Sequence, residues 1–209
     1  MAGVPSARAP SPFTGMAMIR FRALPAVVTA LTIVTAQASA QAGLLSTVAT
    51  VSLSAVKSPS LTVTVNSGTT QSISSITDGA TNDFPTSVNI TTAWDVNPSA
   101  ASVSLVGYFT TPTAALTNGS FNIPSSWVKG KVTTASVPNA PTSFTAFTNA
   151  AVGAAGTAGA SLTLFTETIS GANKASNRTI DLALQLDLTG QTTTPGTYTG
   201  TLNLRAVTQ

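Results

Sequence analysis

The chain has 209 residues, with 9 Lys and Arg against 6 Asp and Glu, and it contains no histidine and no cysteine. The lack of cysteine excludes disulfides and thiolate chemistry, and the lack of histidine removes the usual general base and the commonest transition-metal ligand. The sequence therefore predicts a protein that is not an enzyme, that binds no cofactor or metal, and whose stability depends on its core alone.

The net charge of +3 comes entirely from the N-terminal part of the chain, which holds Arg8, Arg20 and Arg22. Residues 41–209 carry six basic and six acidic side chains, well separated along the sequence. A nucleic-acid-binding protein needs a basic stripe that neutralises phosphates, and six dispersed cations do not form one. We therefore expect no nucleic-acid partner.

Met1–Ala40 has the pattern of a secretory signal peptide. Arg20 and Arg22 form a basic region, Leu24–Thr35 is apolar, and Ala38–Ala40 is a small-residue cleavage site. The apolar run is shorter than the roughly 20 residues that a membrane-spanning helix needs. The pattern predicts export, with the protein secreted or at the cell surface.

The signal peptide has alternative starts at Met16 and Met18, both close before its basic region. The sequence from Gln41 onward is long enough to bury one core. We therefore expect a single domain over residues 41–209.

The first predicted strand follows the cleavage site. Ala49, Val51, Leu53 and Ala55 alternate with hydroxyl side chains, which is the period of a half-buried strand. A turn at Lys57–Ser60 then leads to a second strand, in which Leu61, Val63 and Val65 alternate with threonines.

A weak strand around Ile73 and Ile76 precedes the turn-rich segment Thr77–Asp83. The oxygen atoms of that segment could serve as calcium ligands, but their spacing does not fit a twelve-residue calcium loop, and turns favour the same residue types. Both interpretations stay open. Val88–Val96 predicts a strand with one apolar face that includes Trp94.

The segment Val103–Phe109 is apolar throughout, as in a strand buried on both faces. Asn118-Gly119 predicts a two-residue hairpin turn, because both residues tolerate positive φ angles. Short strands are expected around Phe144–Phe147 and Leu162–Ile169. The Ala- and Gly-rich segment Asn149–Ala160 is expected to be a loop, because its glycines disfavour a helix.

Two alternating segments close the chain, Ile180–Leu188 and Tyr198–Ala206, with Pro195-Gly196 between them. They predict a β-hairpin or a crossover between two sheets. The many short strands, spaced by turns and without an amphipathic helix, predict an all-β fold, an antiparallel Ig-like or jelly-roll β-sandwich.

The segment Pro195–Leu202, with the sequence PGTYTGTL, resembles the closing strand of bacterial secreted subunits of the spore coat protein U and fimbrial (chaperone-usher) pilin-like families. The chain differs from those families in having no cysteine pair. The resemblance implies a subunit of a surface coat or appendage, in which an extended strand of one molecule completes the sheet of the next. It also implies self-association, other surface subunits and a periplasmic chaperone as partners.

Val48–Val56 would then be the donated strand, with Val48, Val51, Leu53 and Ala55 as its apolar residues. Strand addition requires an exposed sheet edge and alternate side chains that fill pockets. The other interpretation is an ordinary first strand of a self-contained sandwich.

Aromatic side chains suggest a second function, that of an adhesin or carbohydrate-binding module. The phase of Trp94 and Tyr198 assigns both to apolar faces, which leaves Tyr108 and Trp127 as candidates for a glycan platform. The sequence thus predicts an exported structural subunit of a coat, fimbria or extracellular matrix, with a secreted glycan-binding module as the alternative.

Overall fold

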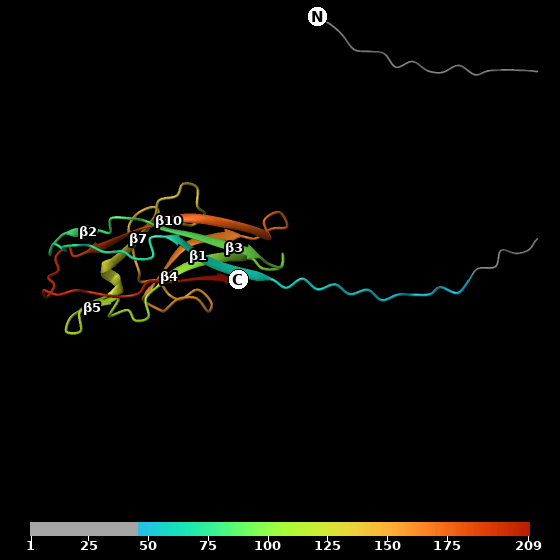
Figure 1. Cartoon of the computed structure of the whole chain (residues 1–209), viewed down its shortest axis with the longest axis horizontal. Coiled ribbons are helices and arrows are strands. Elements are labelled where there is room, and N and C mark those ends of the chain that lie inside the picture. Colours follow the sequence, from blue (N-terminus) through green and yellow to red (C-terminus); the bar gives the residue numbers. More distant parts are fainter. Residues whose placement is uncertain (1–45) are drawn as a thin grey trace, which may run out of the picture. The chain divides into compact units, whose positions relative to one another are not determined.

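The computed structural model describes residues 46–209, which contain eleven β-strands and one 3-10 helix, η1 (Ser125–Trp127). Figure 1 shows the order of the strands along the chain. The largest sheet has six strands: β1 (Ser60–Ser67), β2 (Thr81–Asp83), β3 (Val88–Asp95), β7 (Val128–Val132), β8 (Thr145–Ala146) and β10 (Ala175–Asp187). A second sheet has three: β4 (Ser102–Tyr108), β9 (Ser161–Thr168) and β11 (Asn203–Thr208). A small hairpin joins β5 (Leu116–Thr117) to β6 (Asn122–Ile123).

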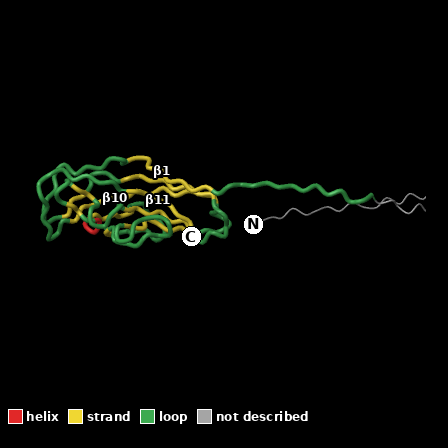
Figure 2. The backbone as a smooth tube through the Cα atoms, turned by 90° about the horizontal axis from the view of Figure 1, so that it is seen from below, coloured by secondary structure: helices red, strands yellow, loops and turns green. Residues whose placement is uncertain are grey.

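The large sheet has the order β1-β3-β10-β7-β8, and the second has the order β11-β4-β9. Every pairing in the two sheets is antiparallel. The two sheets pack face to face (Figures 1 and 2), so the prediction of an all-β antiparallel sandwich is confirmed. Since β10 belongs to one sheet and β11 to the other, the last two strands form a crossover and not a hairpin.

The core lies between the sheets and is built from alternate residues of the strands. Ile90 on β3 and Ile180 on β10 face Leu105 on β4, and all three are completely buried. The predicted inward face of β3 is confirmed, including Trp94, whose indole donates to the carbonyl of Asn173 at 2.8 Å. Strand β4 was expected to be buried on both faces, and its residues from Val103 to Gly107 are all buried.

The outer face of the large sheet carries polar side chains that form hydrogen bonds between neighbouring strands. The hydroxyls of Thr91 and Thr179 lie 2.8 Å apart on neighbouring strands, and Asn89 donates to Asp181 at 2.6 Å. At the edge of the sheet, Asn66 donates to Asn89 at 2.7 Å. These cross-strand pairs favour the observed register of β1, β3 and β10.

Three local predictions are corrected. No strand forms around Ile73 and Ile76, which pack half-buried against the core from a loop. The hairpin at Asn118 does form, but its two loop residues are Gly119 and Ser120, because Asn118 N donates to Phe121 O at 3.2 Å. Gly119 alone of the pair Asn118-Gly119 has a positive φ, 88°.

The predicted closing strand Tyr198–Ala206 begins later, at Asn203. The preceding residues lie beside β5, where Thr199 forms a single antiparallel bridge with Thr117 through two backbone hydrogen bonds. A Cβ atom on Gly200 would lie 2.0 Å from the carbonyl oxygen of Ala115, so only glycine fits there. The alternation there is therefore not that of a strand.

Residues 54–209 form one compact unit, which contains the core. Residues 46–53 belong to a second unit. The predicted signal peptide, Met1–Ala40, lies outside the described residues. The described part has no helix that is long and apolar enough to cross a membrane.

Candidate functional site

The N-terminal arm, residues 46–56, is the segment that differs most from the predicted fold. It was expected to form a strand, but it belongs to no helix or strand and all of its side chains are exposed. The physical reason is that an isolated extended segment is not stable as a strand, and this one has no partner strand in the described part of the chain.

The arm holds every strongly exposed large hydrophobic residue of the described part of the chain. These are Val48 (89% exposed), Val51 (81%), Leu53 (90%) and Val56 (90%). Ala49, Val51, Leu53 and Ala55 would share one face if the arm were an extended strand, with Thr50, Ser52 and Ser54 on the other. The arm thus has the side-chain pattern of a half-buried strand without the burial.

At one edge of the sandwich, the open edge, β1 ends the large sheet and β11 ends the smaller one; each has a single strand partner, and the two strands contact each other without pairing. The inward side chains of both strands remain half-buried: Leu61, Val63 and Val65 on β1, and Leu204 and Ala206 on β11. Inward side chains of the central strands, in contrast, are completely buried. The core is therefore covered less well along this edge than at its centre.

A cleft of about 440 Å³ lies at one end of the open edge, between the start of β1 and the end of β11. It is lined by Leu61, Val96 and Ala100, and by the C-terminal Thr208 and Gln209. Figure 1 shows the C-terminus beside the start of β1. The lining is mainly apolar, so the cleft suits aliphatic side chains.

The other two edges are closed or short. On β9, the backbone N–H of Thr166 donates to Pro138 O, and the side chain of Asn139 donates to Thr166 O at 3.2 Å. At the far edge of the large sheet, β8 has only two residues. Short or covered edges do not serve as templates for a further strand, whereas β1 has eight residues and a single strand partner.

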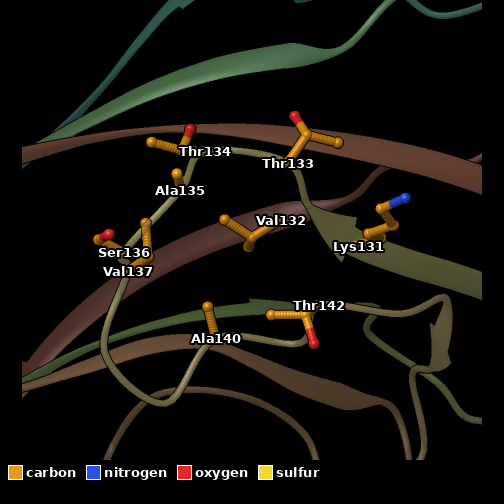
Figure 3. Close-up of a pocket in the computed structure, with 9 residues that line it drawn as sticks. All are labelled: Lys131, Val132, Thr133, Thr134, Ala135, Ser136, Val137, Ala140 and Thr142. Atoms are coloured by element: carbon orange, nitrogen blue, oxygen red, sulfur yellow. The ribbon is translucent and has the colours of Figure 1, made fainter.

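A second cavity, of about 420 Å³, lies under the loop that follows β7 (Figure 3). Its lining comes from Lys131–Val137, Ala140 and Thr142, mostly methyl and hydroxyl groups. The ammonium of Lys131 lies 5.6 Å from the ring centre of Phe144. Ser136 and Asn139 in this loop have φ angles of 59° and 52°. Asn139 covers the β9 edge, so the loop geometry has a structural explanation.

The carboxylates of the described residues are engaged with protein partners. Asp187 pairs with Lys129, and Glu167 pairs with Arg178 across the two sheets. The hydrogen bonds from Lys129 and from Thr189 hold the pKa of Asp187 well below its usual range. A carboxyl group that stays ionised in this way is poorly suited to act as a general acid.

The loop considered for calcium is held together by its own hydrogen bonds. Asp78 accepts from the N–H and the hydroxyl of Thr193, at 3.1 and 2.8 Å, and Asp83 accepts from Gln185 at 2.7 Å. Asn82 bonds to the backbone of Thr77. Within residues 46–209, no three Asp, Glu, His or Cys side chains gather in a group that could hold a metal ion.

The aromatic candidates lie in different elements. Tyr108 ends β4 and Trp127 ends η1, and both are half-buried, with Trp127 packed against the core. Tyr198 donates its hydroxyl to Thr194 O at 2.7 Å and stands edge-on to Phe121. No two of the four predicted rings form an aromatic pair in this part of the chain.

The sequence identified the arm but missed the open edge. The alternation of Leu204 and Ala206 shows that β11 has an inward face, but not that the strand lies at an edge. An edge is defined by the absence of a pairing partner, which a local pattern does not contain.

Comparison with known proteins adds no assignment to this geometry. The sequence matches no protein-family model, and neither curated proteins nor solved structures give a match.

Proposed function

We propose that this protein is an exported structural subunit of a bacterial surface coat, fimbria or extracellular matrix, and that it assembles by donating its N-terminal arm to a sheet edge of another molecule. The observation that carries the proposal is the arm itself. Its four large hydrophobic residues are 81 to 90% exposed, while the domain buries its other apolar strand residues wholly or partly.

The exposed arm is physically costly unless something covers it. Exposed apolar surface in this amount and order marks an interaction site, because water disfavours it. Its alternating side chains fit strand addition, in which backbone hydrogen bonds give affinity and alternate side chains enter pockets. A partner sheet that buries Val51 and Leu53 would gain roughly 1.5–3 kcal/mol from each.

Export and a structural role are supported by the sequence. The signal-peptide pattern of Met1–Ala40 supports a secreted or cell-surface location, and PGTYTGTL at Pro195–Leu202 supports the likeness to coat and pilin-like subunits. A periplasmic chaperone would protect the arm and the open edge before assembly. Other surface subunits that share these features are further candidate partners.

The first test compares the size of two purified chains over a range of concentrations. One is residues 41–209, and the other is the same chain with Val48, Val51, Leu53 and Val56 all replaced by serine. Light scattering and negative-stain microscopy should show concentration-dependent oligomers or filaments for the first and monomers for the second.

The serine variant keeps the length and backbone of the arm, so it isolates the effect of the apolar side chains. Its thermal unfolding should match that of the parent monomer, since the four residues lie outside the core. A parent chain that stays monomeric at every concentration would contradict the proposal.

A further inference from the structure

The arm is also the segment that a protease can reach most readily. We propose that residues 46–56 are a processing site for an endoprotease that accepts small aliphatic side chains, and that cleavage there leaves the folded domain intact but unable to assemble. The step is hydrolysis of one peptide bond, in which water supplies the OH of the new carboxyl group and the hydrogen of the new amine. The loss of assembly rests on the proposed function, whereas the place of cleavage and the class of protease do not.

The backbone of the arm needs no unfolding before it is cut. A protease cuts a folded chain only where the backbone is open or opens transiently. Residues 46–56 are exposed, lie outside every strand, and make no backbone hydrogen bond to another described residue. Exposed segments of small and polar residues are the usual sites of proteolytic nicking. The arm is therefore in the form that a protease binds.

The exposed loops of the domain, in contrast, are held by backbone hydrogen bonds. In the Ala- and Gly-rich loop, the N–H of Gly159 donates to Asn149 O at 3.0 Å, and the N–H of Asn149 donates to Ser161 O at 2.8 Å. In the loop after β7, the N–H of Val132 donates to Pro141 O at 2.8 Å. A cut in a loop needs local opening, and a cut in a core strand needs global unfolding, which is disfavoured by a factor of about 10³ to 10⁸. The arm should therefore be cut first.

The composition of the arm selects the class of protease. Its residues are serine, threonine, alanine, valine and leucine, with no charged or aromatic side chain from Ser46 to Val56. Serine proteases recognise the residue before the cut through one pocket, which is acidic in trypsin, a hydrophobic slot in chymotrypsin and small in elastase. The small pocket fits the alanines and valines of the arm, which are spread over its whole length.

The nearest basic residue lies at the base of the arm and already has a partner. Lys57 forms an ion pair with Asp95 at the end of β3. The acidic pocket of a trypsin-like protease takes up the same ammonium group, so cleavage after Lys57 competes with this pair. A cut within residues 46–56 leaves the pair in place and removes no residue of the core, because the first residue that packs against it is Leu61. The shortened domain should therefore keep its stability.

Limited digestion of residues 41–209 with elastase and with trypsin tests the site. The chain is kept at a concentration at which it is monomeric, and intact mass and N-terminal sequencing follow the products. Elastase should remove the arm at least about 10³-fold faster than it cuts any core strand, and the product should start within residues 47–57. Trypsin at the same molar ratio should act more slowly. The product should have the Tm of the parent monomer.

Two matched variants separate the accessibility of the arm from its composition. Ser52→Arg and Ala158→Arg each replace an exposed residue, the first in the arm and the second in the hydrogen-bonded loop 149–160. Trypsin should cut Ser52→Arg after position 52 about as fast as elastase cuts the parent arm. Over the same time it should leave position 158 of Ala158→Arg uncut.

The outcomes distinguish this inference from the proposed function. A first elastase cut inside residues 58–209, or equal trypsin cutting at the two introduced positions, would overturn the arm as the processing site and leave the proposed function standing. Faster removal of the parent arm by trypsin than by elastase would overturn the class of protease. The shortened domain should stay monomeric at concentrations where the parent forms oligomers. A shortened domain that still assembles would overturn the proposed function and leave the cleavage site standing.

Discussion

Replacing Leu53 by alanine should weaken assembly strongly while leaving the domain intact. Leu53 is 90% exposed and makes no contribution to the core, so the free energy of unfolding of the monomer should change by less than about 0.5 kcal/mol. A fully buried leucine, in contrast, is worth about 1.5–3 kcal/mol relative to an exposed one. Alanine retains part of this, so a loss of about 2 kcal/mol at each interface is expected.

Because about 1.4 kcal/mol corresponds to a tenfold change in affinity, the dissociation constant should rise by roughly 10- to 100-fold. Sedimentation velocity over a concentration series measures this shift, and thermal unfolding of the monomer checks the domain. The matched control is Ser52→Ala, the neighbour on the opposite face of the arm, which should assemble as the parent does. Equal assembly of Leu53→Ala and the parent, or a Tm lowered by several degrees, would refute the reasoning.

Three further changes test the domain itself. Thr92→Val should raise stability by about 1 kcal/mol in chemical denaturation, because the buried hydroxyl of Thr92 has no hydrogen-bond partner; a less stable variant would contradict this. Gly130→Ala should cost about 1–3 kcal/mol, since its Cβ would lie 3.0 and 3.2 Å from two core leucines, whereas Gly171→Ala, with open space around it, should be nearly neutral. The pKa of Asp187 is lowered in the folded state, so its contribution to stability is present above the unfolded pKa of about 4 and is lost as the pH falls below that. Asp187→Asn should therefore lower the Tm at neutral pH and less so in acid, and a Tm difference independent of pH would exclude the Lys129 pair as its cause.

The sandwich was predictable because its strongest strands alternate cleanly. Val88–Val96 and Ile180–Leu188 place every second residue in the core, and the structure keeps both faces as expected. Leu61–Val65 also forms a strand, β1. In these segments the local pattern and the tertiary environment agree. The two-residue period of the apolar side chains was therefore sufficient to predict each strand and its buried face.

Alternation failed where a segment has the pattern of a strand but no strand to pair with. The arm alternates as well as β1 does, yet it lies unpaired, and Tyr198–Leu202 alternates but forms only a single bridge, from Thr199 to β5. Pairing is a long-range property, and a sequence read alone contains no information on which edges meet. The open edge beside β11 was missed for the same reason.

The position of β10 in the large sheet also constrains how the chain folds. Leu182 of β10 pairs with Val88 on one side and Val132 on the other, so the strand that joins the first half of the sheet to the second is made last. A chain that ends before Ala175 has β3 and β7 with nothing between them. Folding is dominated by such distant pairings, which is typical of domains that fold in milliseconds to seconds. The growing polypeptide should therefore remain unfolded until β10 has been synthesised.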